Sequence, residues 1–272
     1  MAPEAASIVT YRTSPAELRH VLGLLSRAGV NHVYVVDNAS SAEIRSVCGE
    51  FREVEYIPSR NVGYGAGHNM ALRRSLSSGV RYHLVLNTDV DFNPADLGLL
   101  TDYLERNPAA GCVAPRLVCA DGAPQYAARL LPTPTDLLIR RFLPSEIMKT
   151  RRHRYELRMF DGTGTYSAPF LFGSFMLLRA EALRRHGIFD ERFFLYMEDV
   201  DLTRRLHRHW RTVSVPFVTV RHEHRAESYR SLRMLALHCV SAVRYFTKWG
   251  WFRDDERSRF NDAALDQFRI IK

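Results

Sequence analysis

The sequence predicts an α/β fold with a mostly parallel sheet flanked by helices. Two observations lead to this prediction. Short apolar runs alternate with segments of helical periodicity through the first half of the chain. The 272 residues are 46% hydrophobic and 25% charged, which is the composition of a soluble globular protein, and the length fits one large domain or one domain with an appendage.

The first half of the chain contains the clearest elements. Apolar runs predict strands at residues 7–11, 33–36, 54–57 and 82–86. Helical periodicity predicts a helix at 15–27 that begins after Ser14 as its cap, and another at 66–76 after a glycine-containing turn. A third helix at 94–106 begins at Pro94, a residue type favoured in the first turn.

Regular structure lapses between Cys119 and Thr165. Four prolines and two arginine clusters in this segment indicate an active-site loop region and not a domain boundary. Beyond it we expect a strand at 172–178 and helices at 180–186 and 200–210. A bent pair of strands is expected over 213–220, around Pro216.

The tail predicts an amphipathic helix at 231–249. Its apolar residues recur at helical spacing and its basic residues gather on another face; these are Leu232, Leu235, Cys239, Val243 and Phe246, and Arg230, Arg233, Arg244 and Lys248. Such a helix can pack on the rest of the chain, pair with a second subunit in a homodimer, or lie on an anionic membrane surface. Trp249 and Trp251 fit the membrane arrangement, and the sequence leaves all three open.

The net charge of +8 limits the classes of binding partner that we expect for this protein. A basic excess attracts nucleic acid, anionic lipid or phosphorylated substrates. The sequence has no zinc-finger or RNA-recognition signature and no interleaved aromatic platform. We therefore expect no nucleic-acid partner. Solvated basic faces are the default interpretation of the charge, and a membrane surface is the favoured functional one.

The sequence also predicts a cytoplasmic protein. No run approaches the ~18 apolar residues of a membrane-spanning helix, and residues 1–7 lack the basic and apolar regions of a secretory signal. The cysteines at 48, 112, 119 and 239 show no zinc-type spacing and are interpreted as reduced thiols. Peripheral attachment to the inner face of the cytoplasmic membrane is compatible with the basic tail.

The run from Tyr82 to Phe92 contains the strongest chemical signal. A buried strand ends there in Asn87, Asp89 and Asp91. Hard cations such as Mg²⁺ or Mn²⁺ take oxygen ligands and often keep diphosphate oxygens as partners. Ligands of open α/β sheets bind outside the carboxyl ends of strands. The run therefore predicts a nucleoside diphosphate held through a metal, and the alternative is an acidic turn before a helix cap.

Two further strand ends have the chemistry of ligand sites. Asp37 and Asn38 close the second strand, where they can bond a base edge or a ribose, or simply form a turn. The segment from Asn61 to Asn69 opens a helix and contains three alternate glycines, which let a backbone approach an anionic ligand. Its G-x-G-x-G spacing does not match the dinucleotide fingerprint, so a tight turn without a ligand stays open.

Acidic and histidine residues mark the second half of the chain. Glu198, Asp199 and Asp201 stand at a helix start, where the helix dipole alone stabilises an exposed anion by ~0.3–1 kcal/mol. Aromatic residues just before them can form a sugar-binding wall and raise the pKa of a carboxylate towards that of a general base. His222 and His224 follow the last strand in an H-x-H pattern that points both rings to one side, which suits metal binding. No cysteine lies nearby to favour a zinc site, so a structural histidine is the better interpretation of this pattern by itself.

Taken in order, these segments resemble the family 2 glycosyltransferases, and most closely the rhamnosyltransferase-like branch that builds bacterial surface polysaccharides. The matching segments lie between Ser7 and Ser228 and are 8–11, 35–40, 61–65 with Asn69, 86–90, 173–179, 187–191, 193–202, and His222 with Ser228. The resemblance implies a GT-A fold, in which a Rossmann-like nucleotide-binding half joins an acceptor half. We therefore expect a catalytic domain over 1–228, with a donor half at about 1–118 and an acceptor half at about 119–228, followed by a helical extension over 229–272.

The resemblance also implies a metal-dependent, inverting enzyme. A sugar would pass from a nucleotide donor, dTDP-rhamnose or alternatively a UDP-sugar, to a hydroxyl group of a glycan or lipid-linked saccharide. Asp199 matches the residue that takes the proton of that hydroxyl. Asp89 matches the metal-binding aspartate, and His222 matches a late histidine near the metal, which is expected to be Mg²⁺ or Mn²⁺. Asn87 stands where many members have a first aspartate, so either Asn87 or Asp91 partners Asp89.

The donor-binding residues follow from the same resemblance. The end of the first strand and Asp37 would hold the base and ribose, and the glycine turn would line the donor pocket. The full set is Thr10, Tyr11, Arg12, Asp37, Asn38, Asn61, Gly63, Gly65, Asn69, Asn87 and Thr88.

Two other functions stay open on the sequence. A sugar nucleotidyltransferase also combines such a sheet with Mg²⁺. Such enzymes usually place a glycine-rich, basic phosphate loop directly after the first strand, whereas this chain has residues 10–14, Thr-Tyr-Arg-Thr-Ser, there. A non-catalytic nucleotide-sugar-binding module could keep the fold, although the acidic groups of Asp89 and Asp199 argue against it.

Overall fold

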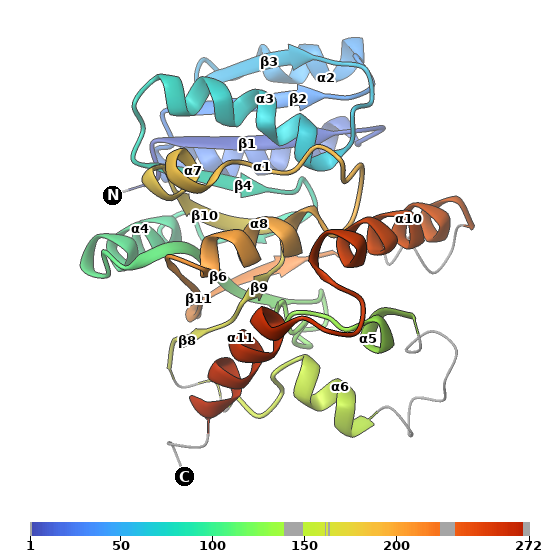
Figure 1. Ribbon diagram of the computed structural model, residues 1–272. Helices are drawn as coiled ribbons and strands as arrows, with labels where there is room; N and C mark the ends of the chain where they lie inside the picture. The colour runs from blue at the N-terminus through green and yellow to red at the C-terminus, as the bar shows by residue number, and fades with distance from the viewer. Residues whose placement is uncertain (1, 139–148, 161, 163, 224–231, 269–272) are drawn as a thin grey trace.

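A mixed sheet of nine strands forms the centre of the part of the chain that the structure describes (Figure 1). The computed structural model describes residues 2–138, 149–160, 162, 164–223 and 232–268. The strand order is β3-β2-β1-β4-β10-β6-β11-β5, with β8 beside β11. These strands are β1 (Ala5–Thr10), β2 (His32–Asp37), β3 (Val54–Pro58), β4 (Tyr82–Leu86), β5 (Val90–Phe92), β6 (Ala110–Val118), β8 (Tyr166–Ser167), β10 (Phe175–Arg179) and β11 (Arg211–His222).

Parallel ladders contain most of the paired residues. β3, β2, β1 and β4 run parallel to one another, as do β6 and β11, whereas β10 runs antiparallel between β4 and β6 and β5 runs antiparallel to β11. The carboxyl ends of β1, β2, β4, β6 and β11 therefore meet at one edge of the sheet, where β10 begins. The predicted α/β class with a mostly parallel sheet flanked by helices is confirmed.

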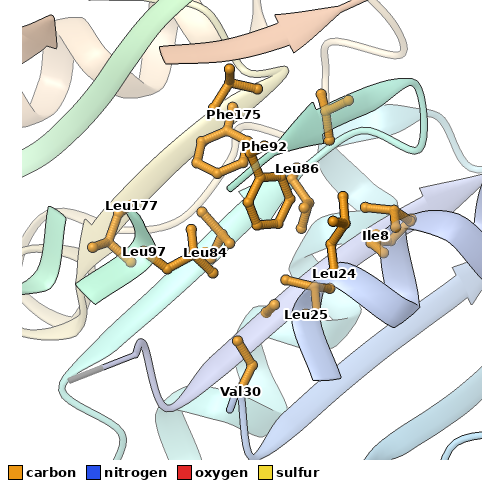
Figure 2. Packing of buried hydrophobic residues seen from close by; sticks show 14 of the residues in the cluster. Ile8, Leu24, Leu25, Val30, Leu84, Leu86, Phe92, Leu97, Phe175 and Leu177 are labelled. Carbon is orange, nitrogen blue, oxygen red and sulfur yellow. The ribbon is translucent and has the colours of Figure 1, made fainter. Parts of the chain in front are cut away.

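Helices cover both faces of this sheet. α1, α2 and α4 pack on one face, where Figure 2 shows Leu25 of α1 near Ile8, with Leu84 and Phe92 in the same cluster. α3, α7 and α8 pack on the other face. The small sheet of β7 (Ala128–Arg129) and β9 (Phe170–Leu171) lies next to α8, which it contacts through β9. The helices are α1 (Pro15–Ala28), α2 (Ala42–Cys48), α3 (Tyr64–Ser77), α4 (Asp96–Arg106), α5 (Pro134–Leu138), α6 (Lys149–Tyr155), α7 (Ala180–His186), α8 (Glu198–His207), α10 (Leu232–Trp249) and α11 (Asp255–Asp266).

Some elements differ from the sequence prediction. The prediction lacks β5 to β9, α2, α5, α6 and α11, of which β7, α5 and α6 fall in the segment expected to lack regular structure. β6 escapes notice because it contains Gly111 and Pro115, which disfavour strands. Gly111 is needed there because a Cβ would press on the ring of Trp210. The predicted strand pair around Pro216 is instead one long strand, β11, whose bend is a register shift beside that proline.

The C-terminal helices are fastened to α8 by a buried arginine. Arg204 is 1% exposed and donates hydrogen bonds to both carboxylate oxygens of Asp254, at 2.6 and 2.8 Å. Its guanidinium lies 4.1 Å from the centre of the Trp249 ring. One turn earlier on α8, Asp201 accepts hydrogen bonds from Lys248 at 2.6 Å and from Trp249 at 2.9 Å. α10 and α11 are therefore held by charged groups as well as by apolar packing.

This packing changes the interpretation of the amphipathic helix. α10 buries Ser241, Ala242, Tyr245 and Phe246, so Phe246 is the one residue of the predicted apolar stripe that is fully buried. Lys248 and Trp249, expected at a membrane interface, bind a buried carboxylate instead. Trp251 packs against Phe246 with ring centres 5.3 Å apart. One side of the C-terminal half of α10 thus packs into the protein interior, while Val243 and Arg244 on the same half stay exposed.

Other sequence expectations concern the ends of the elements and the cysteines. The expected boundary at 228/229, His224, Ser228 and Arg230 lie outside the described residues. Within the described ranges, no helix combines the length and the hydropathy that crossing a bilayer requires. All four cysteines are free thiols, and two of them are buried.

We predict that Arg204→Ala destabilises the protein by about 3–5 kcal/mol, because it leaves the carboxylate of Asp254 buried without its partner. Equilibrium urea unfolding measures the loss. Arg208→Ala is the matched control, since Arg208 pairs with Glu256 at the surface and its removal should cost about 1 kcal/mol or less. Equal losses in the two variants would contradict the structural role of Arg204.

Candidate active site

Two segments bring polar side chains together at the carboxyl edge of the sheet. Asn87 and Asp89 follow β4, and His222 ends β11. Nε2 of His222 lies 3.4 Å from Oδ1 of Asp89 and 3.5 Å from Nδ2 of Asn87. The backbone N–H of Glu223 donates to the carbonyl oxygen of Asp89 at 2.9 Å, which fixes the two segments to each other. The Asp89 side chain stays 20% exposed, so this group is open to a ligand.

The carboxyl group of Asp89 is held in its ionised form. Burial acts to raise its pKa, but hydrogen bonding with His222 and Asn87 and the positive charge of His222 in its protonated form outweigh burial. The pKa is therefore lowered from its ordinary value. A carboxylate beside an imidazole nitrogen and an amide is a set of groups that Mn²⁺ or Mg²⁺ accepts as ligands.

The side chain of Asp91 has different partners from that of Asp89. It lies in β5 with its side chain 47% exposed, and it pairs with His20 of α1 at 3.1 Å and with Arg221 at 3.4 Å. Among the described residues no group of three or more His, Cys, Asp or Glu side chains could hold a metal ion. Of the predicted metal set, the structure brings Asp89 and His222 together, and a metal role for Asp91 stays a prediction.

Asp199 is fixed at the first turn of α8. Its Oδ2 accepts a hydrogen bond from the backbone N–H of Gly173 at 3.0 Å, and its Oδ1 accepts one from that of Val200 at 2.8 Å. Gly173 lies just before β10, at the same edge of the sheet as Asp89. A Cβ at position 173 would approach the Cβ of Asp199 to 3.2 Å, so glycine permits this close contact.

Asp199 and the adjacent Glu198 differ in their electrostatics. Burial raises the pKa of Asp199, although the backbone N–H groups of Gly173 and Val200 and the charge of Arg129 oppose that rise. Glu198 is 4% exposed, and its Oε2 finds no hydrogen-bond partner among the described residues. Burial and then the charge of Asp199 raise the pKa of Glu198 well above its ordinary value. The pKa of Glu198 is thus raised further than that of Asp199, which favours a proton on Glu198 and leaves Asp199 as the better candidate to accept one.

Tyr64 joins the two acidic positions. Its hydroxyl lies 3.0 Å from Oδ1 of Asn87 and 2.8 Å from the carbonyl oxygen of Gly173, and its single proton can be donated to one of them at a time. Burial and three neighbouring carboxyl groups raise its pKa well above the ordinary value, so the hydroxyl stays protonated. Tyr64 is thus a neutral bridge between the Asp89 and Asp199 sides of the site.

The glycine turn is shaped by packing. Gly63 has a φ of 94°, and a Cβ there would collide with the carbonyl group of Phe194. A Cβ at Gly65 would press on the side chains of Phe189 and Glu198. The glycines therefore let the segment before α8 lie directly against α3, which accounts for the turn without a ligand. Donor contacts of Gly63 and Gly65 stay predictions.

Two asparagines of the same motif are bonded within the protein. Oδ1 of Asn61 accepts a hydrogen bond from the backbone N–H of Gly63 at 3.2 Å. The amide of Asn69 accepts from the N–H of Phe189 at 3.0 Å and donates to its carbonyl oxygen at 2.9 Å and to Glu191 at 2.9 Å. Both side chains order the loops around the predicted donor pocket, and direct contact with a donor stays a prediction.

The first two strands end in a saturated carboxylate. Asp37 accepts hydrogen bonds from Thr10 at 3.1 Å, from the N–H groups of Ala39 and Ser41 at 3.0 and 2.6 Å, and from Tyr56 at 3.0 Å. A carboxylate has about four acceptor positions, so these donors use all of them. In the structure Asp37 orders the turn before α2, and its contact with a base or ribose stays a prediction.

The remaining predicted donor residues line the same edge. Asn38 donates to the carbonyl oxygen of Gly63 at 3.1 Å, and its own buried Oδ1 has no hydrogen-bond partner in the part of the chain that the structure describes. Tyr11 is exposed, and the Arg12 guanidinium lies 5.4 Å from its ring centre. Thr88 is partly exposed between Asn87 and Asp89. Tyr11, Arg12 and Thr88 are accessible from the solvent side, whereas Asn38 is buried.

Sequence reasoning misses Gln125, Tyr64, Gly173 and Glu198 as site residues. Gln125 makes two hydrogen bonds with His222, although 97 positions separate them. Tyr64 and Gly173 are inside quoted motifs, yet only their contacts with Asn87 and Asp199 reveal their part. No local pattern predicts such contacts. A cavity of about 170 Å³ behind Tyr126, lined also by Arg116 and Arg158, contains none of the predicted site residues.

The comparison with known families agrees with this geometry. The model of the family described as "Glycosyl transferase family 2" matches residues 7–187. The chain belongs to glycosyl transferase family 2. The resemblance seen in the sequence is thereby confirmed, and the enzyme class is that of a glycosyltransferase.

Curated relatives place this family 2 glycosyltransferase in the rhamnosyltransferase-like branch. The N-acetylglucosaminyl-diphospho-decaprenol L-rhamnosyltransferase of Mycobacterium tuberculosis is 31% identical over 237 residues, which are 81% of this chain and 75% of that protein. Rhamnosyltransferase WbbL of Escherichia coli is 27% identical over 183 residues, covering 64% of this chain and 65% of that one.

Solved structures support the GT-A fold. A mannosyltransferase from Pyrobaculum calidifontis, described in complex with GDP-Man and Mn²⁺, superposes with a TM-score of 0.58 at 18% sequence identity. The similarity covers 90% of this chain but 65% of that protein, so the chain spans just under two thirds of its length. Residues 1–349 of Staphylococcus aureus TarS give a TM-score of 0.55 at 13% identity, covering 89% and 71% of the two chains.

We predict that Glu198→Gln is more stable than the wild type at alkaline pH. Because the native pKa of Glu198 is raised, the native state binds its proton more tightly than the unfolded state above the ordinary value of 4.5. Wild-type stability must then fall as pH rises from that value through the raised pKa, and glutamine removes this loss. Melting temperatures between about pH 5 and pH 9 test the sign. Glu181→Gln, at an exposed site, is the control; a difference that stays constant with pH would exclude a protonated Glu198.

Proposed function

We propose that this family 2 glycosyltransferase transfers a sugar from a nucleoside diphosphate sugar to a hydroxyl group of a glycan or lipid-linked saccharide, with inversion at the anomeric carbon. The observation that carries the proposal is the carboxyl group of Asp199, held by two backbone N–H groups at the sheet edge where Asp89 meets His222. dTDP-rhamnose is the favoured donor because two relatives are named rhamnosyltransferases, and a UDP-sugar is the alternative.

In this proposal the donor half comprises about residues 1–118 and the acceptor half about 119–228, with 229–272 as the extension. The nucleotide lies against the ends of β1 and β2, near Thr10, Asp37 and the unpaired amide oxygen of Asn38. A buried acceptor atom without a protein partner is suited to the N–H of a base. The acceptor half supplies Gly173 and Asp199.

Mg²⁺ or Mn²⁺ fits the Asp89 side of the site. Asp89 is ionised and His222 presents a ring nitrogen 3.4 Å from it, and these two would hold the cation. The ion, when bound, neutralises charge on the leaving nucleoside diphosphate. The similar mannosyltransferase structure is described with Mn²⁺ and a nucleotide sugar, which supports the same requirement here.

The protein groups around Asp199 account for the proton transfer. The acceptor oxygen forms its bond to the anomeric carbon while the bond to the diphosphate oxygen breaks, and its proton passes to the carboxylate of Asp199. The N–H groups of Gly173 and Val200 orient that carboxylate, and burial makes it a stronger base. Neutral Glu198 avoids a second negative charge beside the acceptor.

A membrane surface is the proposed partner of α10. Leu232, Ala236, Val240 and Val243 recur along one side of the helix and are all exposed, with Val240 at 46% and Val243 at 50%. Exposed Arg233 and Arg244 stand beside them. An apolar row flanked by cations suits an anionic bilayer surface. The protein would then work at the inner face of the cytoplasmic membrane, where a lipid-linked acceptor is present.

We predict that Asp199→Asn lowers kcat for sugar transfer by about 10²–10⁴-fold, because the general base is lost. Binding of the donor nucleotide, measured by calorimetry with Mn²⁺, should stay near the wild-type value. Asp255→Asn, at an exposed position of α11, should change neither quantity. Near-normal turnover of Asp199→Asn would remove Asp199 from this role.

Metal-dependent release of nucleoside diphosphate by the wild type separates the enzyme from a non-catalytic binding module. Such a module would bind the donor nucleotide without releasing the diphosphate. Addition of a chelator should abolish the release. A nucleotidyltransferase would instead form a nucleotide sugar from a sugar phosphate.

We predict that the wild-type protein floats with vesicles that contain phosphatidylglycerol and not with vesicles of phosphatidylcholine alone. The double variant Val240→Ser with Val243→Ser should bind several-fold less, because it removes apolar area from the exposed row of α10. Leu99→Ser with Phe217→Ser is the matched control at exposed sites elsewhere. If the α10 variant binds vesicles normally but converts a dimer to a monomer in light scattering, a second copy covers this row.

A further inference from the structure

Gln125 holds His222 at two points. The segment that follows β6 places it there, because its backbone N–H donates to the carbonyl oxygen of Leu117 at 3.0 Å. Nε2 of Gln125 donates to the carbonyl oxygen of His222 at 2.6 Å. Oε1 of Gln125 lies 2.8 Å from Nδ1 of the His222 ring. The side-chain amide of Gln125 thus contacts both the main chain and the ring of His222.

These two contacts determine which ring nitrogen carries the proton. A backbone carbonyl only accepts hydrogen bonds, so the NH₂ end of the Gln125 amide must face it. The amide oxygen is then left facing Nδ1, and an oxygen that only accepts requires a proton on Nδ1. In neutral His222 the lone pair is consequently on Nε2. Nδ2 of Asn87 faces that nitrogen at 3.5 Å, which agrees with its being an acceptor.

The lone pair on Nε2 of His222 faces Asp89. Nε2 lies 3.4 Å from Oδ1 of Asp89. Two electron-rich atoms at this separation suit a cation that both can contact. A histidine ligand to a metal ordinarily donates its other N–H to an oxygen acceptor, which fixes the ring. Gln125 supplies that acceptor.

We propose that Gln125 is a positioning residue that holds His222 in its Nδ1–H form, so that Nε2 and Asp89 together receive the divalent cation. The proposal rests on the metal site of the proposed function. A purely structural glutamine needs only the bond to the His222 carbonyl oxygen. The additional bond to Nδ1 gives Gln125 control over the ring, and its loss should show in the ring and in the affinity for the cation.

Metal binding without donor or acceptor provides the first test. We expect Gln125→Met to weaken Mn²⁺ binding by about 10–100-fold in calorimetric titration, as loss of a residue that orients a ligand typically does. Gln125→Glu keeps an oxygen acceptor for Nδ1 and should recover most of the affinity. Gln267→Met is the matched control, because Gln267 also grips one residue at two points, accepting from the N–H of Ser167 and donating to its carbonyl oxygen, both at 2.8 Å.

The tautomer of the metal-free protein provides the second test. Nitrogen NMR of labelled protein distinguishes Nδ1–H from Nε2–H imidazole, and the His222→Asn variant identifies the resonances. We expect Nδ1–H in the wild type and in Gln125→Glu, and a shift towards Nε2–H in Gln125→Met. A glutamine that only supports the fold would change the melting temperature without changing the tautomer.

The outcomes separate the two levels of inference. If the wild type binds no Mn²⁺, the metal site itself is wrong. If the wild type and Gln125→Met bind Mn²⁺ equally with the same tautomer, the metal site stands and the role of Gln125 is overturned. Weaker Mn²⁺ binding with a changed tautomer, restored by Gln125→Glu, supports the proposal.

Discussion

The buried ion pair between Arg204 and Asp254 fixes α8, and most of the acidic side of the site depends on α8. A guanidinium that is almost fully buried needs carboxylates around it, and Asp254 provides both oxygens. Because Asp254 comes from the C-terminal extension, the extension helps to set the position of the helix that begins with Glu198 and Asp199. The site therefore includes supporting groups far beyond residues 7–187, which match the family.

Because α8 is held by contacts at its middle, its first turn can contain carboxyl groups in an unfavourable, buried arrangement. Two adjacent carboxyl groups oppose folding, since Oε2 of Glu198 is buried with no hydrogen-bond partner among the described residues, and the contacts of Arg204 and Asp201 with the C-terminal helices compensate. This arrangement gives Asp199 a raised pKa while Asp89, a short distance along the same edge, has a lowered one. The two carboxyl groups are thereby suited to different tasks, one to accept a proton and the other to stay charged.

The predictable part of the structure is local, and the rest depends on contacts between distant residues. The strands ending at Asp37 and before Asn87 are read from apolar runs, and their shared edge follows from parallel pairing. β6 could not be predicted from local sequence, because its pairing with β10 and β11 stabilises the strand despite Gly111 and Pro115. Asp91 illustrates the limit of spacing: β5 turns its carboxylate towards His20 of α1, a residue that no motif connects with it.

The same limit applies to the groups that orient the site. Motif order assigns Asp89, Asp199 and His222, because each stands in a recognisable segment. It does not assign Gln125 or Tyr64, since their importance comes from hydrogen bonds to His222 and Asn87. Nor does helical periodicity reveal which side of α10 faces inward, because Asp201 and Arg204 decide this through charge.

The contact between Gly63 and Phe194 sets a limit on how this protein can change over evolution. The atom that a side chain at 63 would meet is a main-chain carbonyl, which every amino acid possesses. No substitution at 194 can therefore make room, and position 63 has no compensating partner. Gly65 and Gly67 meet side chains, those of Phe189 and Val9 among them, so a smaller neighbour could accommodate a replacement. Of the three glycines in this short motif, Gly63 cannot be replaced whatever residue lies against it. Gly65 and Gly67 could be replaced if a neighbouring side chain became smaller.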